Sequence, residues 1–253
     1  MPDPDLTTQP NLGLALGGGG ALGAAHVGVL QVLHERGIRP TIVAGTSAGA
    51  VMGAAYARGR DPYELEQMVL GATWGDFGTL TFTPGLGVLD TAGLRRTVER
   101  LSASDVMIED LPLTFAAVAT DARTREAVVL NSGPLVDAVC ASIAVPGVFR
   151  PSRAHGHLLI DGGVVQNLPL QTAFDLGAEQ VIGVRLAAEF DYGPAPRTAI
   201  AVHELEIDRR VTIIAPRLGG RAQWSARDLA GLILLGREAA ERTLSDYPVV
   251  HPR

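Results

Sequence analysis

The sequence predicts one α/β domain with a mainly parallel sheet, and two observations carry that prediction. Of the 253 residues, 47% are hydrophobic but only 5% are aromatic, a composition that suits helices packed closely on a parallel sheet. Residues 12–44 then follow the order strand, glycine loop, helix, strand, which is the order of a right-handed crossover between parallel strands. Chains of this length commonly form one domain. We expect it to span residues 11–253, after a flexible tail at residues 1–10.

The individual elements are predicted from apolar runs and from the residues that bound them. Gly37 ends the first helix, and Asp61 and Pro62 are typical of the N-cap and first position of a later one. Residues 74–87 mix aromatic residues with glycine and are expected to form a loop or an apolar flap, and residues 189–199 an exposed linker. The predicted strands are 12–16, 41–44, 113–119, 127–130, 158–160, 180–186 and 211–215, and the predicted helices are 24–36, 47–58, 63–70, 91–101, 135–143, 170–176 and 226–244.

The charged residues and cysteine exclude several classes of function. The formal net charge is −6, and all 21 basic residues are arginine. An acidic chain has no broad electrostatic attraction to nucleic acid or to an anionic bilayer. Without lysine the chain cannot provide a P-loop, a Schiff base or a Ser-Lys dyad. Cys140 is the only cysteine, so an internal disulfide is impossible, and we expect neither a metal site nor a cofactor.

A long uncharged stretch runs from Leu6 to His34. Its length would suit a membrane span or a signal peptide. However, Asp3 and Asp5 stand where a signal peptide is basic, and seven glycines between Gly13 and Gly28 interrupt the apolar surface. We therefore expect a buried strand, a glycine loop and a buried helix in a cytoplasmic protein, with peripheral contact to a membrane left open.

Ser47 lies in the Gly-x-Ser-x-Gly pattern of a nucleophile elbow. Gly45 and Gly49 flank it, after a predicted strand and at the start of a predicted helix. The elbow is a sharp turn in which side chains two residues from the serine would collide with the strand, so small residues are needed there. The alternative is a glycine turn with an incidental serine.

A glycine-rich loop precedes Ser47 and offers backbone N–H groups at a helix start. Gly18, Gly19, Gly20 and Gly23 also satisfy the dinucleotide-binding pattern Gly-x-Gly-x-x-Gly. That site needs an acidic residue at the end of the second strand to bind a ribose, and this chain instead continues there into Ser47. We interpret the loop as an oxyanion hole, in which each donor typically contributes about 2.7–4 kcal/mol in the transition state.

The base that activates Ser47 could be a histidine or Asp161. In the usual order of a hydrolase triad, the histidine follows the serine. The histidines after the serine are His155, His157, His203 and His251. None of them has the setting of a strand-end loop with glycine, whereas Asp161 follows an apolar strand and precedes two glycines. Asp-Gly is also a common hairpin turn, and a carboxylate with an ordinary pKa of about 3.9 must be made more basic by desolvation.

Together these motifs resemble those of the bacterial patatin-like phospholipases, which are serine acyl hydrolases with a Ser-Asp dyad. The resemblance covers about residues 12–186 and the final helix. It is carried, in the family's order, by the glycine-rich loop, by Ser47, and by Asp161 with its two glycines, and residues 141–151 and 162–169 also resemble family segments. It implies a three-layer α/β/α fold with a mainly parallel central sheet.

The resemblance also implies a mechanism on a lipid or other acyl ester. Ser47 would attack the ester carbonyl, Asp161 would take the proton and return it to the leaving alcohol, and the loop from Gly18 to Gly23 would hold the oxyanion. Leu22 departs from the family, which usually carries Arg or Lys just before the last glycine of the loop. This departure leaves open a catalytically weak member with a binding or regulatory role, and an α/β-hydrolase with a Ser-His-Asp triad is the third hypothesis.

Overall fold

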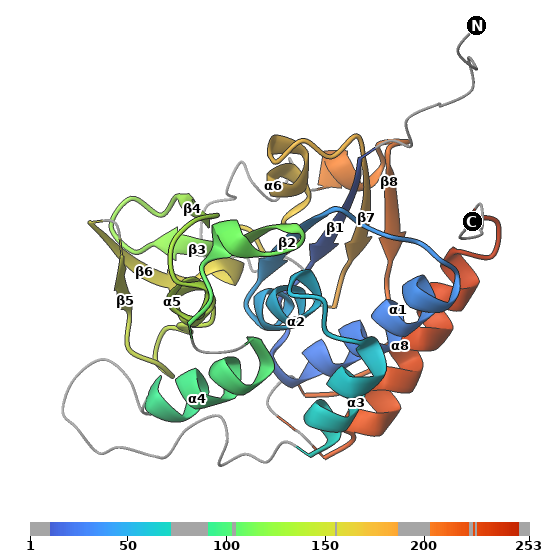
Figure 1. Cartoon of the computed structure of the whole chain (residues 1–253), viewed down its shortest axis with the longest axis horizontal. Coiled ribbons are helices and arrows are strands. Elements are labelled where there is room, and N and C mark those ends of the chain that lie inside the picture. Colours follow the sequence, from blue (N-terminus) through green and yellow to red (C-terminus); the bar gives the residue numbers. More distant parts are fainter. Residues whose placement is uncertain are drawn as a thin grey trace, which may run out of the picture.

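A computed structural model describes residues 11–71, 91–102, 105–154, 156–186, 203–222, 225 and 227–247. Within these ranges eight strands form one sheet, with helices packed against it (Figure 1). The strands are β1 (Leu12–Leu16), β2 (Ile42–Thr46), β3 (Thr114–Asp121), β4 (Ala127–Leu130), β5 (Ser152–Ala154), β6 (His157–Asp161), β7 (Gln180–Val184) and β8 (Val211–Ile214). The α-helices are α1 (Ala24–Glu35), α2 (Ala48–Ala57), α3 (Pro62–Leu70), α4 (Thr91–Ser102), α5 (Leu135–Ser142), α6 (Leu170–Asp175) and α8 (Leu229–Thr243), and the 3₁₀ helices are η1 (Gly20–Gly23), η3 (Ile108–Asp110) and η4 (Gly162–Val164).

The sheet has a parallel half and an antiparallel half. Strands β3, β2, β1, β7 and β8 are neighbours in that order and all run parallel. Strands β4, β5 and β6 run antiparallel to their partners. Strand β5 is not predicted from the sequence, because its three residues are too few to show an alternating pattern. The expected tail, flap and linker at residues 1–10, 74–87 and 189–199 lie outside the described residues.

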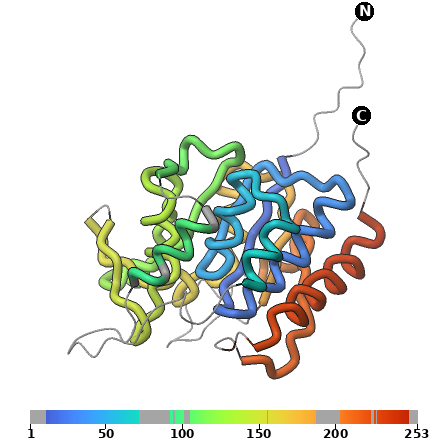
Figure 2. The backbone as a smooth tube through the Cα atoms, turned by 60° about the horizontal axis from the view of Figure 1, so that its bottom comes forward, coloured from blue at the N-terminus to red at the C-terminus, as the bar shows by residue number. Residues whose placement is uncertain are grey.

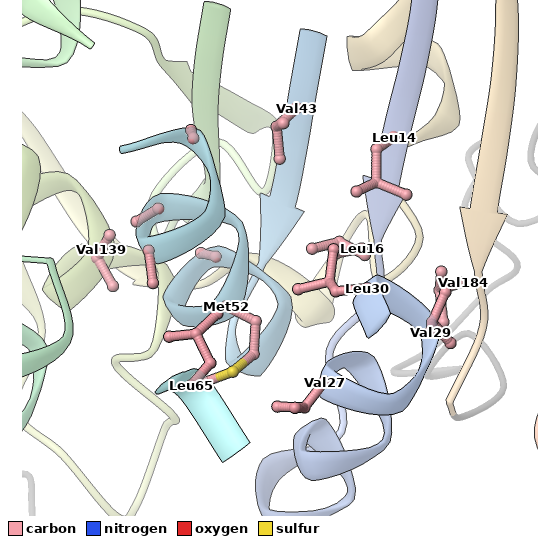
Figure 3. Packing of buried hydrophobic residues seen from close by; sticks show 14 of the residues in the cluster. Leu14, Leu16, Val27, Val29, Leu30, Val43, Met52, Leu65, Val139 and Val184 are labelled. Carbon is pink, nitrogen blue, oxygen red and sulfur yellow. The ribbon is translucent and has the colours of Figure 1, made fainter. Parts of the chain in front are cut away.

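The alternation of side chains along the strands divides the core into two layers. Successive strand residues point to opposite faces. Accordingly, Leu14 and Leu16 of β1 belong to a large apolar cluster with α1 and α2, whereas Ala15 belongs to a smaller cluster with α6. Figure 3 shows Leu16 of the sheet beside Leu30 of α1. The three-layer α/β/α fold expected from the sequence is confirmed.

The uncharged stretch found in the sequence includes β1, η1 and α1, and α1 lies along α8 (Figure 2). The backbones of the two helices are in close contact. A Cβ added to Gly28 would lie 2.0 Å from the Ile233 carbonyl oxygen, and one added to Gly236 would lie 2.0 Å from that of Ala25. Glycine is therefore required on both helices. Among the described helices, none combines the length and apolarity needed to cross a membrane.

Two strands share one edge of β3. β4 pairs with β3 along residues 117–120, while β2 and β6 pair with it along residues 114–118 and 119–121. At a given residue each edge of a strand bonds one neighbour. Because β2 and β6 both overlap the span of β4, both must lie on the opposite edge of β3. One runs parallel and the other antiparallel to β3, so their carboxyl ends point toward each other.

Candidate active site

Ser47 and Asp161 meet where β2 and β6 end. Thr46, the last residue of β2, pairs with Val118 of β3, and Asp161, the last residue of β6, pairs with the next residue, Ala119. The Ser47 hydroxyl donates a hydrogen bond to Oδ2 of Asp161 at 2.6 Å. The two residues are only 8% and 6% exposed. The register on β3 thus brings together two side chains that are 114 residues apart in the chain.

Ser47 has the backbone of a strained elbow. Its φ of 53° and ψ of −121° are unusual for a residue with a side chain, and such conformations cost about 1–3 kcal/mol. Helix α2 begins at the next residue. A Cβ on Gly45 would lie 2.5 Å from the Gly49 carbonyl oxygen, and a Cβ on Gly49 would lie 2.0 Å from that of Leu16. The steric need for small residues on both sides of Ser47 is confirmed.

Asp161 is held on three sides. Its Oδ1 accepts the N–H of Gly163 at 2.7 Å, its Oδ2 accepts the hydroxyl of Ser47, and its own N–H donates to the Ala144 carbonyl at 2.9 Å. Burial raises the pKa of Asp161 to about 6, although the hydrogen bonds from Ser47 and Gly163 favour the ionised form. The carboxylate is therefore more basic than an ordinary aspartate, as the sequence analysis requires, and it is still ionised at neutral pH.

The glycine-rich loop lies against Ser47, but its glycines serve different purposes. A Cβ on Gly18 would lie 3.2 Å from the Ser47 Cβ. The N–H of Gly18 already donates to the Asn167 carbonyl at 3.1 Å, so this group is not available to an oxyanion. Within the described residues, the N–H groups of Gly19 and Gly20 have no acceptor. Two of the four predicted glycines, Gly19 and Gly20, are thus the candidate donors.

The fold also explains why glycine occupies positions 20 and 23. Gly20 has a φ of 58°, a left-handed conformation that favours glycine. Gly23 ends η1 just before α1, and a Cβ there would lie 2.6 Å from the Cβ of Ala48. The absence of a side chain at Gly23 therefore allows the start of α1 to pack against the start of α2.

His26 binds the backbone just before the glycine-rich loop, a role that is not predicted from the sequence. Its Nε2 lies 2.8 Å from the Gly17 carbonyl oxygen, and the side chain is fully buried. Burial lowers the pKa of His26 to about 4, so the ring is neutral at physiological pH, when Nε2–H can donate to that carbonyl. Within the described residues, its Nδ1 has no hydrogen-bond partner.

Two further supporting residues were also missed. The Ser47 N–H donates to Oγ of Ser142 at 2.9 Å, and the Thr46 hydroxyl donates to the Gln166 carbonyl at 3.0 Å. Both acceptors belong to the segments 141–151 and 162–169, whose likeness to a family was the only signal in the sequence. These pairs could not be read from the sequence, because their members are 95 and 120 residues apart in the chain.

The described histidines do not form a triad with Ser47. His157 begins β6, at the opposite end from Asp161, and its Nδ1 lies 2.5 Å from Oδ2 of Asp121. His203 is largely exposed and lies beside Glu206. His155 and His251 lie outside the described residues.

Leu22 and Cys140 are both core residues. Leu22 is 6% exposed and belongs to the large apolar cluster, so an arginine or lysine on this backbone would bury a charge among apolar side chains, which is costly. Burial raises the pKa of the Cys140 thiol to about 11, so a thiolate is not available at neutral pH. Across the described part of the chain, no three His, Cys, Asp or Glu residues are grouped so that they could hold a metal ion.

Comparisons with known proteins agree on one family. A family model described as "Patatin-like phospholipase" matches residues 14–174. An uncharacterized NTE family protein of Mycobacterium tuberculosis is 40% identical over 198 residues, which are 75% of this chain and 52% of the relative. Human patatin-like phospholipase domain-containing protein 6 is 34% identical over 193 residues, 73% of this chain and 14% of the relative. The chain thus spans about half the length of the mycobacterial relatives that it matches.

Solved structures show the same fold at low sequence identity. VipD of Legionella pneumophila matches with a TM-score of 0.65 and 16% identity, over 94% of this chain and 67% of that protein. The ExoU-SpcU complex of Pseudomonas aeruginosa contains a chain that matches with a TM-score of 0.50 and 18% identity, over 94% of this chain and 52% of that one.

Proposed function

The chain belongs to the patatin-like phospholipase family, and from that membership we propose that it is a serine acyl hydrolase that cleaves carboxylic esters of lipids. In this proposal Ser47 is the nucleophile, Asp161 is the general base, and the N–H groups of Gly19 and Gly20 bind the oxyanion. The observation that carries it is the 2.6 Å hydrogen bond from the Ser47 hydroxyl to the buried Asp161 carboxylate. Bonds from a hydroxyl to a carboxylate of this length are charge-assisted.

The first half of the reaction forms an acyl-enzyme. Oγ of Ser47 attacks the ester carbonyl carbon while its proton passes to Oδ2 of Asp161. The carbonyl oxygen becomes negatively charged and accepts hydrogen bonds from Gly19 and Gly20. When the tetrahedral intermediate collapses, the bond to the alcohol oxygen breaks and that oxygen takes the proton from Asp161. The alcohol leaves, and the acyl group stays on Ser47.

The second half repeats the same proton transfers with water. A water molecule gives a proton to Asp161 while the oxygen of the water attacks the acyl carbon. Collapse of the second intermediate breaks the bond to Oγ, and the proton on Asp161 returns to Ser47. The carboxylic acid leaves, and the site regains its starting protonation state. A base with a pKa near 6 suits both directions of transfer, because it accepts a proton readily and also gives it back near neutral pH.

Covalent labelling and ester hydrolysis together test this proposal. We expect a fluorophosphonate to label the wild-type protein at Ser47, located by mass spectrometry. We expect Ser47→Ala to abolish labelling and to lower the hydrolysis of p-nitrophenyl esters and phospholipid vesicles by at least about 10³-fold. Ser152→Ala is a matched control, because Ser152 lies on β5, whose strand partner is β6 and not the elbow after β2.

The outcomes separate the alternatives. Labelling at Ser47 with hydrolysis of vesicle lipid supports the proposal. Unchanged labelling of the Ser47→Ala protein would remove Ser47 as the nucleophile. A wild-type protein that neither reacts with the fluorophosphonate nor cleaves any ester would favour the binding or regulatory role.

A further inference from the structure

The end of α5 and the residues just after it bind the chain where β2 and β6 end. Ser47 lies just beyond β2, so its N–H has no strand partner, and it donates to the Oγ of Ser142, the last residue of α5. The N–H of Asp161 donates to the carbonyl of Ala144, two residues further along. One short segment, residues 142–144, therefore holds the backbones of both members of the Ser47–Asp161 pair.

The Ser142 hydroxyl is the centre of a bridge to the sheet. It accepts the N–H of Ser47 at 2.9 Å and donates to the Val118 carbonyl of β3 at 2.6 Å. A serine in a helix usually donates to a carbonyl of the preceding turn in its own helix. Here the hydroxyl spans to a strand 24 residues earlier in the chain, and Ser142 is 0% exposed.

This bridge holds the backbone of Ser47, the residue whose displacement would most affect the proposed reaction. The elbow backbone of Ser47 is strained, and strained conformations persist only where their surroundings hold them. A buried N–H without an acceptor also costs free energy, which would favour relaxation of the elbow. Val118 is the β3 residue that pairs with Thr46, directly before the one that pairs with Asp161. The bridge thus ties the nucleophile to the same point of the sheet that places the carboxylate.

We propose that Ser142 is a positioning residue that holds the Ser47 hydroxyl on the Asp161 carboxylate. Its own hydroxyl does this by accepting the Ser47 N–H and donating to the Val118 carbonyl. The inference rests on the proposed function, because it assigns a purpose to Ser142 only if Ser47 is the nucleophile. The bridge does not contact the substrate, so its loss should change the chemical step more than substrate binding. Loss of the bridge should also weaken the Ser47–Asp161 hydrogen bond, which is one of the contacts that lower the pKa of Asp161.

The test compares three substitutions at Ser142 with a control. Ser142→Ala removes the bridge, Ser142→Cys keeps a weak donor and acceptor, and Ser142→Thr keeps the hydroxyl. Thr97→Val is the control, because Thr97 is a buried residue of α4 whose hydroxyl donates to the Gly93 carbonyl of its own helix. For each protein we would measure kcat, KM, the pH dependence of kcat/KM, and hydrogen exchange of the Ser47 amide by NMR.

For Ser142→Ala we expect kcat to fall by about 10- to 100-fold, as for a small misplacement of a reacting group, with KM changed by less than about twofold. The acid limb of the pH profile should move to higher pH, and the Ser47 amide should exchange faster than the amides of β2. Ser142→Thr should restore kcat toward the wild-type value, Ser142→Cys should lie between, and Thr97→Val should match the wild type in kcat and in its acid limb.

A folded Ser142→Ala protein with wild-type kcat, acid limb and Ser47 exchange would overturn the inference. If that protein does not fold, Ser142→Cys decides, because a wild-type kcat and acid limb in it would equally overturn the role. A wild-type protein that is inactive and unlabelled at Ser47 would instead overturn the proposed function, and with it the catalytic purpose of the bridge. In that case the exchange measurement still reports whether Ser142 holds the Ser47 amide.

Discussion

The pairing of β3 with β6 carries a buried aspartate at each end, and the two carboxyl groups have opposite pKa shifts. Asp121 ends β3 and Asp161 ends β6, and they are 4% and 6% exposed. Each accepts the N–H of the residue two positions later, from Arg123 at one end and from Gly163 at the other. In chain position, exposed fraction and backbone hydrogen bonding the two aspartates are alike.

The difference in pKa comes from the side-chain partner and from desolvation. The hydrogen bond from His157, with smaller help from the N–H of Arg123, lowers the pKa of Asp121. Asp161 has a serine hydroxyl as its partner, and burial raises its pKa to about 6. A carboxylate beside an imidazole becomes a weaker base, while one beside a neutral hydroxyl keeps a high proton affinity. The comparison teaches that, of these two aspartates, the one without a histidine partner has the proton affinity that the proposed general base needs.

Substitution of each aspartate gives the largest expected contrast. We expect Asp161→Asn to lower kcat/KM for ester hydrolysis by at least about 10²-fold, the lower end for loss of a general base. Asp121→Asn and His157→Ala should each cost less than about tenfold, because neither group touches Ser47. Steady-state kinetics on folded protein checks this. A His157→Ala protein as inactive as Asp161→Asn would favour a triad and break the contrast.

The pH dependence gives the second contrast. Asp161 must be ionised to accept a proton, so kcat/KM should fall as the pH drops through the pKa of about 6. Below that pKa the fall should be about tenfold per pH unit. Asp121→Asn should leave this limb in place, whereas the residual activity of Asp161→Asn should lack it. If the acid limb moved in Asp121→Asn but not in Asp161→Asn, the group that titrates would be Asp121 and not Asp161.

Stability gives the smallest contrast, and its sign differs between the two ends. The folded-state pKa of Asp161 lies above the ordinary aspartate pKa of 3.8, so folding loses stability as the pH rises from about 4 to about 6. Asp161→Asn removes that penalty and should raise the free energy of unfolding at pH 8, by up to about 3 kcal/mol. The gain should vanish below about pH 4, where the carboxyl group is neutral in both states.

Asp121 should behave in the opposite way. Its pKa is lowered in the folded protein, so it contributes stability above its ordinary pKa and loses it as the pH falls through the lowered value. Asp121→Asn should therefore lower the free energy of unfolding at pH 8, and the loss should shrink in acid. Urea titrations at several pH values measure both variants. If both substitutions changed the free energy of unfolding in the same direction at pH 8, the opposite pKa shifts of the two aspartates would be contradicted.

The site could be predicted from the sequence where its geometry is local. The Ser47 elbow follows from Gly45 and Gly49 because the clashes they avoid involve neighbouring turns and the adjacent strand. Asp161 was found from the two glycines after it. The roles of Ser142 and His26, and the bond that occupies the Gly18 N–H, could not be found in this way. Each depends on a partner brought close by folding.

The sequence by itself determined the order of the elements, the turn at Ser47 and the residues able to act as nucleophile and base. These depend on apolar periodicity and on the steric needs of a few consecutive residues. Only the tertiary structure decided that Asp161 lies against the Ser47 hydroxyl, because β2 and β6 pair with one edge of β3 and end at neighbouring residues of it. It also decided the basicity of Asp161, because desolvation depends on everything packed around a carboxylate and not on its neighbours in the chain.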